Sequence, residues 1–330
     1  MTSPPAEQGV NAGALTAALD LGGTMPGLTS VVVARRGRLV AERYFRAGGA
    51  DSLYALRSVT KSVMSLLVGA AIERGVIRGT DQTLAELFQP PLPALDAVHG
   101  AITVADLLTM RSGIAWNEGG NVAEYNGWAL APDQIEYLLA RDVVEPPGTR
   151  WNYNSAAVHL LAAAIEVKAG GTVAFADRYL LEPLGIRSRD WEIDNRGIPN
   201  GGAGLYLRPR DLAKIGQLVL QQGRSGSGFV VPAAWVQSST ARRLATGTSL
   251  GNLGTLGYGD LWWLGRAGAT DVVLAWGHGG QYVYVVPALE LVVATTATWQ
   301  GLGTGAGPQT AAIADLITNR IVPAVGATGS

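Results

Sequence analysis

A serine and a lysine three positions apart mark the part of this sequence that could do chemistry. Ser58 and Lys61 stand at the start of a segment, residues 63–72, that is apolar almost all round. Residues three apart share one face of a helix, so the hydroxyl and the amine lie within reach of each other. A serine here often only caps a helix, but a lysine in the first turn opposes the helix dipole and is desolvated at a cost. The pair therefore indicates a hydroxyl nucleophile beside an amine that accepts its proton.

Lysine is rare in this chain, which makes its choice at position 61 informative. Of the 25 lysine and arginine residues, only Lys61, Lys168 and Lys214 are lysine. Arginine cannot release its proton in a protein, whereas a buried lysine can become a base. The choice of lysine therefore supports proton transfer at position 61 over a merely structural charge.

Two later segments accompany this pair. Residues 147–155 read Pro-Gly-Thr-Arg-Trp-Asn-Tyr-Asn-Ser, and residues 276–281 read Trp-Gly-His-Gly-Gly-Gln ahead of an apolar strand. With the three segments in this order, the chain resembles the serine β-lactamase-like superfamily. That superfamily includes class C β-lactamases, family VIII carboxylesterases and 6-aminohexanoate-dimer hydrolases. The resemblance runs from about residue 28 to residue 320.

The resemblance implies the catalytic roles. Ser58 attacks the substrate carbonyl, while Lys61 and Tyr153 move the protons. The backbone amides of Ser58 and Gln281 form the oxyanion hole, which stabilises the negative charge that develops on the carbonyl oxygen.

The resemblance also implies where the substrate binds. His278, Gly279 and Gly280 stand in the place of a Lys-Thr-Gly element, so the cation that would hold a β-lactam carboxylate is weakened or absent. Ser155 stands where many members have asparagine. A loop over residues 116–128 would cover the substrate, with its tyrosine donating to a leaving amine. Substrate contacts are therefore expected from Trp116, Asn117, Tyr125, Ser155, His278, Gly279 and Gly280.

The elements that must position these residues follow from local patterns. Residues 58–73 form a buried helix, because their apolar side chains face every direction. The order hairpin, helices, strands and final helix predicts an α+β fold, with an antiparallel sheet flanked by helices as in β-lactamases and transpeptidases. Residues 1–77 and 223–330 would form the sheet domain, and residues 78–222 a mostly helical one. The expected strands are 30–34, 39–45, 259–264, 272–276, 282–286 and 291–296, and the expected later helices are 132–141, 209–222 and 308–321.

The composition of the chain argues against several classes of binding partner. The net charge of −1 offers no basic patch for nucleic acid, and the lack of cysteine excludes disulfides and thiolate chemistry. The three histidines have no zinc-ligand spacing, and His99 and His159 are interpreted as structural, so neither a metal nor a cofactor is expected. Residues 1–13 lack a secretory pattern and no apolar stretch is long enough to span a bilayer, so we expect a cytoplasmic protein without a membrane partner.

These observations favour a serine hydrolase that cleaves small amides or esters through an acyl-enzyme on Ser58, like the 6-aminohexanoate-oligomer hydrolases or the carboxylesterases. A D-alanyl carboxypeptidase or β-lactamase is an alternative, which His278 disfavours. A binding or sensor module without turnover is a second alternative. The serine, lysine and tyrosine together speak against it, because a pure binder has no need of a desolvated lysine.

Overall fold

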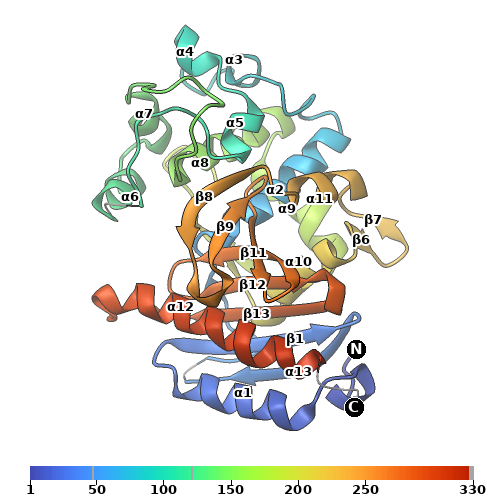
Figure 1. The fold of residues 1–330 in the computed structure, drawn as a ribbon. Coiled ribbons are helices and arrows are strands. Elements are labelled where there is room, and N and C mark those ends of the chain that lie inside the picture. The colour runs from blue at the N-terminus through green and yellow to red at the C-terminus, as the bar shows by residue number, and fades with distance from the viewer. Residues whose placement is uncertain (47, 120–121, 327–330) are drawn as a thin grey trace.

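An eight-stranded antiparallel sheet forms the centre of the computed structural model, which describes residues 1–46, 48–119 and 122–326 (Figure 1). The strand order is β2-β1-β13-β12-β11-β10-β9-β8. The sheet confirms the predicted fold class. Its strands are β1 (Leu28–Arg35), β2 (Arg38–Tyr44), β8 (Leu244–Ser249), β9 (Thr255–Tyr258), β10 (Trp263–Ala267), β11 (Thr270–Gly277), β12 (Gln281–Val286) and β13 (Leu291–Ala297).

The hairpin of β1 and β2 shows how local sequence fixes this sheet. Its two-residue turn is Arg36-Gly37, and both residues have positive φ angles, 50° and 73°. Such a turn matches the right-handed twist of the flanking strands, and glycine adopts a positive φ at little cost. The predicted hairpin is confirmed, and β13 pairs with the other edge of β1.

Successive side chains of β12 contact helices on opposite faces of the sheet. Tyr282 donates its hydroxyl to the Thr310 carbonyl of α12 (Ala306–Leu316), which packs on one face with α1 (Ala12–Thr24). Val283 and Val285 point the other way, toward α10 (Pro209–Leu220), where a Cβ at Gly216 would come within 2.7 Å of Val283 Cγ1. Because successive side chains of a strand face opposite sides, two helical layers enclose the sheet.

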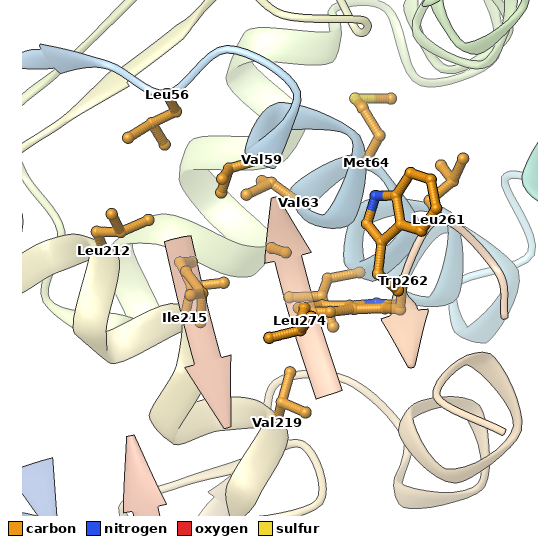
Figure 2. Close-up of a cluster of buried hydrophobic side chains, with 14 of the residues drawn as sticks. Leu56, Val59, Val63, Met64, Leu212, Ile215, Val219, Leu261, Trp262 and Leu274 are labelled. Carbon is orange, nitrogen blue, oxygen red and sulfur yellow. The ribbon is translucent and has the colours of Figure 1, made fainter. Parts of the chain in front are cut away.

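The helix α2 (Val59–Glu73) lies at the centre of the molecule, between the sheet and the helical part of the chain (Figure 1). Figure 2 shows Val59 and Val63 of α2 gathered with Leu212 and Ile215 of α10 and with Leu274 of β11. The predicted buried helix is therefore confirmed, since every residue from Val59 to Ala71 is buried. The remaining helices are α3 (Leu84–Leu87), α4 (Ala97–Gly100), α5 (Val104–Leu108), α6 (Val122–Ala129), α7 (Gln134–Leu139), α8 (Ser155–Ala169), α9 (Thr172–Ala176), α11 (Ala233–Ser239) and α13 (Val322–Gly326).

Several elements differ from the prediction. The expected strand 259–264 is wrong in part, because the chain turns between β9 and β10 and only its end belongs to β10. The helix expected from residue 132 begins at Gln134, after Asp133 caps it by accepting from two backbone amides. The helix α10 falls inside the range expected for the helical domain, yet it packs on the sheet against β12 and β13.

Within the described residues, no single helix is long and apolar enough to cross a membrane. The helix α8 and residues 172–184 meet that criterion only as a pair, and they are bent by 88° at the break between them.

Candidate active site

The candidate nucleophile, Ser58, stands immediately before the first residue of α2. Its side chain makes no capping hydrogen bond, so the common helix-capping role of serine does not apply. Arg57, the residue before it, has a φ of 51°, a conformation that costs free energy for a residue with a side chain. The turn at Arg57 therefore presents the Ser58 hydroxyl at the mouth of a helix whose body is buried.

Lys61, which the sequence predicts as the base, is buried beside Ser58. Its side chain is 1% exposed, and its amine donates to Ser58 Oγ over 2.8 Å and to the Gly202 carbonyl oxygen over 2.6 Å. Burial lowers the pKa of Lys61 to about 7, because a charged amine is poorly solvated in the protein interior. The negative charge of Glu118 acts against this change, and the positive charge of Arg57 adds to it. The amine can therefore exchange its proton near neutral pH.

Tyr153 lies beside this pair, just before α8. The Lys61 amine sits 4.8 Å from the centre of the Tyr153 ring, and Trp263 stacks on that ring with centroids 5.8 Å apart. Burial raises the pKa of Tyr153 well above its usual value, the charge of Glu118 raises it further, and a hydrogen bond with Ser58 acts in the opposite direction. The phenol therefore keeps its proton at neutral pH.

The environment pushes the pKa values of Lys61 and Tyr153 in opposite directions. Lowering the pKa of a lysine makes it a better base, and a neutral tyrosine is a proton donor. Two titratable groups separated in this way mark the base and the acid of a catalytic site. The geometry therefore suits Lys61 as the base and Tyr153 as the acid on either side of Ser58 Oγ.

A buried pair, His159 and Asp194, supports the loop that holds Lys61. His159 Nε2 lies 3.0 Å from Asp194 Oδ2, and both side chains are 1% exposed. The Gly201 amide donates to His159 Nδ1 over 3.4 Å, which leaves Nε2 to carry the ring proton toward Asp194. Gly202, the next residue, provides the carbonyl that accepts from Lys61. His159, interpreted as structural from the sequence, thus supports the loop whose Gly202 carbonyl accepts from Lys61.

The end of β11 closes the other side of the site. A Cβ at Gly277 would lie 2.4 Å from the Leu56 carbonyl oxygen, so this strand end approaches the segment before Ser58 closely. His278 follows and lines the cavity. Among the described residues, neither the Ser58 nor the His278 backbone amide donates a hydrogen bond. These two N–H groups are therefore available to a substrate oxygen.

The expected role of the Gln281 amide does not fit this arrangement. Gln281 is fully buried, pairs with Gly277 in the ladder of β11 and β12, and is absent from the cavity wall. Its side chain bonds to the Ala297 backbone at both the amide and the carbonyl. His278, three positions earlier in the chain, lines the cavity instead.

A cavity of about 660 Å³ opens over Ser58 and Tyr153. Three indole rings, those of Trp151, Trp263 and Trp276, form an apolar part of its wall. The rest of the wall comes from the end of β8, from α12 and from three loops. These residues are Thr248, Ser249, Leu250 and Gly251 at the end of β8, Gly307, Thr310 and Ala311 of α12, and Asn117, Glu118, Gly119, Asn152 and His278. Of the residues expected to contact substrate, the structure thus places Asn117 and His278 on this wall.

The other expected contacts lie elsewhere. Trp116 is buried and donates its indole N–H to Glu118 Oε2 over 3.0 Å. Tyr125 belongs to α6, where its ring faces the Arg57 guanidinium at 5.2 Å, so it does not line the cavity. Gly279 and Gly280 are buried in the turn after β11. A Cβ at Gly279 would collide with Trp299, and a Cβ at Gly280 would collide with Ile313.

Glu118 is the functional candidate that the sequence analysis missed. It lines the cavity, accepts from the Ser155 amide over 2.8 Å and accepts from the Ser155 hydroxyl over 2.6 Å. Ser155 is therefore fully buried and occupied by Glu118 rather than free to contact substrate. The only signal in the sequence is its position directly after Trp116 and Asn117, since a single carboxylate forms no motif.

A second serine on the cavity wall belongs to a Gly-x-Ser-x-Gly sequence, residues 247–251, which some serine hydrolases use as a nucleophile turn. Ser249 is exposed at the end of the edge strand β8. Its hydroxyl makes no hydrogen bond to another described side chain, and His278 on the same wall has no carboxylate partner among the described residues. Ser249 therefore has no neighbouring amine like the one that Lys61 places 2.8 Å from Ser58 Oγ.

Comparison with known proteins gives consistent matches. The family model described as Beta-lactamase matches residues 15–317. The 6-aminohexanoate-dimer hydrolase of Paenarthrobacter ureafaciens is 28% identical over 290 residues, which are 82% of this chain and 73% of that protein. Esterase EstB of Burkholderia gladioli is 28% identical over 180 residues, which are 47% of this chain and 45% of the esterase.

Solved structures share the fold. EstCE1, described as a hydrolase with promiscuous acyltransferase activity, has a TM-score of 0.73 at 19% identity, with 95% of this chain and 98% of that one covered. The octameric penicillin-binding protein homologue from Pyrococcus abyssi has a TM-score of 0.73 at 19% identity, with 94% of this chain and 76% of that one covered.

Proposed function

Because this chain belongs to the Beta-lactamase family, we propose that it is a serine hydrolase that cleaves small amides or esters through an acyl-enzyme on Ser58. The observation that carries the proposal is the Lys61 amine, which is 1% exposed and lies 2.8 Å from Ser58 Oγ. A buried amine with a pKa of about 7 is a base at neutral pH, and its closest polar neighbours are a hydroxyl and a carbonyl. The named relatives, a 6-aminohexanoate-dimer hydrolase and an esterase, support the choice of amides and esters.

The proposed reaction begins when neutral Lys61 takes the proton of Ser58 as its oxygen attacks the substrate carbonyl carbon. The amides of Ser58 and His278 stabilise the resulting oxyanion, because fixed N–H dipoles favour charge that develops in the transition state. Tyr153 gives its proton to the leaving nitrogen or oxygen, and Lys61 restores it. Water then attacks the acyl-enzyme while Lys61 takes its proton, and Lys61 returns that proton to Ser58 Oγ as the acid leaves.

The cavity supports small, partly apolar substrates. Trp151, Trp263 and Trp276 provide flat apolar surface beside the nucleophile. Partial desolvation of the His278 ring, together with the charge of Arg57, lowers its pKa below the usual value. At neutral pH it is therefore a poor substitute for the lysine that holds a β-lactam carboxylate, which favours other amides and esters over β-lactams.

A fluorophosphonate probe tests the nucleophile. The expected result is one adduct, mapped by mass spectrometry to the peptide that contains Ser58, together with hydrolysis of 4-nitrophenyl acetate. Ser58→Ala should abolish both. Ser249→Ala should keep the adduct, and so should Ser65→Ala, which removes a buried hydroxyl on the same helix that has no hydrogen-bond partner.

Two outcomes contradict the proposal in different ways. An adduct that survives Ser58→Ala and disappears in Ser249→Ala would identify the Gly-x-Ser-x-Gly serine as the nucleophile. Absence of both adduct and turnover in the unaltered protein would favour a binding or sensor module on the same fold.

A further inference from the structure

We propose that Arg57 binds a carboxylate of the substrate, so that this hydrolase prefers amides or esters carrying a negative charge near the scissile bond. The inference rests on the proposed function and deepens it by naming a substrate class. Arg57 directly precedes the nucleophile, and its guanidinium lies near two aromatic rings. The Tyr125 ring centre lies 5.2 Å from Arg57 Cζ, and the Trp299 ring centre lies 5.1 Å from it.

The Arg57 guanidinium has no anionic partner in the part of the chain that the structure describes, where no carboxylate oxygen lies within 4.0 Å of it. The residue is half-buried, and its Nε atom is buried without a hydrogen-bond partner. A partly desolvated cation costs free energy unless an opposite charge or hydrogen-bond acceptors compensate it. The two aromatic faces compensate only in part, because cation–π attraction is weaker than a charge-assisted hydrogen bond. The Tyr125 hydroxyl also interacts with the guanidinium, and the other N–H groups are available to a ligand anion.

The position of Arg57 places that anion close to the reacting atoms. Its charge lowers the pKa of Lys61 and of His278, and it acts on Tyr153 as well. These effects agree with the place of Arg57 in the chain directly before the nucleophile, beside the cavity rather than on its wall. His278 contacts Trp299 edge to face, with centroids 6.3 Å apart, so Arg57 lies behind the His278 side of the cavity.

A carboxylate is the anion that this geometry fits best. A guanidinium presents parallel N–H groups in a plane, which match the two oxygens of a carboxylate. Contact with the Tyr125 and Trp299 rings restricts the guanidinium before the ligand arrives, so less conformational freedom is lost on binding. The left-handed backbone of Arg57, with φ of 51°, directs the side chain toward these rings while Ser58 enters α2.

Two matched substrate pairs test the preference on the two sides of the scissile bond. Mono-4-nitrophenyl adipate is compared with its methyl ester, which removes the charge from the acyl chain. 4-Acetoxybenzoate is compared with its methyl ester, which removes the charge from the leaving group. We expect the unaltered enzyme to favour the charged member of at least one pair by about 10- to 100-fold in kcat/KM, which is the usual contribution of a charge-assisted hydrogen bond.

Variants assign the preference to Arg57. In Arg57→Gln the ratio within the preferred pair should fall to about 1, and in Arg57→Lys it should be intermediate, because the charge stays while the planar fork is lost. Arg74→Gln is the matched control. It removes a cation whose Cζ lies 4.4 Å from the Tyr179 ring centre at the far end of α2, a helix of 15 residues that is about 22 Å long at 1.5 Å per residue, and it should keep the ratio.

The ratio separates binding of an anion from a purely structural role. If Arg57 only clamps Tyr125 and Trp299, Arg57→Gln lowers turnover of both members of a pair equally, and the inference is overturned. Equal turnover of charged and neutral esters by the unaltered enzyme also overturns it while leaving the serine hydrolase intact. Absence of turnover and of a fluorophosphonate adduct refutes the proposed function itself, and the inference with it.

Discussion

The burial of Lys61 should make the protein less stable at neutral pH than at alkaline pH, and Lys61→Met measures this directly. In the unfolded chain the amine has its ordinary pKa of 10.5, and in the folded chain the pKa is about 7. A change of one unit in pKa corresponds to about 1.4 kcal/mol. Burial of the Lys61 amine therefore lowers the free energy of unfolding by up to about 5 kcal/mol. Methionine has a similar length and no charge, so the variant removes that cost.

The sign follows from proton binding. Between pH 7 and pH 10.5 the unfolded chain holds a proton on Lys61 that the folded chain releases, so stability rises with pH across this window. The cost is fully present below pH 7 and disappears above pH 10.5. From these two pKa values we calculate a cost of about 4 kcal/mol at pH 7 and about 2 kcal/mol at pH 9.

Urea unfolding at pH 7, 8 and 9 is the assay, with the unaltered protein and Lys61→Met measured in parallel. Taking the difference between the two proteins cancels the other titrating groups, including the buried tyrosines. The stability advantage of the variant, reduced by the two hydrogen bonds that it loses, should fall by about 2 kcal/mol from pH 7 to pH 9. A difference that is independent of pH would show that the folded amine keeps its ordinary pKa, and the assignment of Lys61 as a neutral-pH base would then be wrong.

Three further changes test the rest of the site. Tyr153→Phe should lower kcat by about 100-fold or more, the usual contribution of a general acid, as measured by release of 4-nitrophenol. Glu118→Gln removes a charge that raises the pKa of Lys61, so the acidic limb of the kcat/KM profile should move to lower pH, and an unmoved limb would contradict this. Gly202→Ala should lower the free energy of unfolding by about 1–3 kcal/mol in urea titration, because its Cβ would lie 2.7 Å from the Ser155 carbonyl oxygen; an unchanged midpoint would show that this contact relaxes.

The sequence predicted the elements whose patterns are strong. Ser58 and Lys61 lie one turn apart at the start of a buried helix, as the long apolar run after them indicates. The hairpin of β1 and β2 follows from two β-branched or aromatic runs around Arg36-Gly37. These features depend on neighbours in the sequence, so no knowledge of distant contacts was needed.

The elements that the sequence did not predict depend on distant contacts. The strand β8 alternates exposed and half-buried residues of small size, Leu-Ala-Thr-Gly-Thr-Ser, and is recognisable only by its pairing with β9. The helix α1 is rich in alanine and glycine, and it is stabilised by packing on α12 and β1. Their contributions to the cavity and to the sheet edge were therefore invisible in the chain alone.

The predicted alignment of residues 276–281, at the end of β11, differs from the structure for another reason. Glycine occurs at positions 277, 279 and 280, so more than one alignment of the motif satisfies the pattern. The structure decides between them because only Gly277 lies against the Leu56 carbonyl beside the nucleophile, and this brings His278 rather than Gln281 to the cavity. The close approach of two backbones cannot be read from a sequence with several glycines in a row.

The charges around Lys61 explain why its pKa comes near neutrality rather than much lower. Burial alone would favour the neutral amine strongly, and Arg57 acts in the same direction, while Glu118 acts against both. Glu118 is fixed by the amide and hydroxyl of Ser155, so its charge cannot move away when a substrate enters. A carboxylate bound at Arg57 would weaken the opposing charge and raise the pKa of the base. Because the amine titrates near pH 7, a substrate of that kind would leave less of Lys61 neutral at pH 7 and would move the acidic limb of the activity profile to higher pH, which links recognition of the substrate to the pH dependence of the reaction.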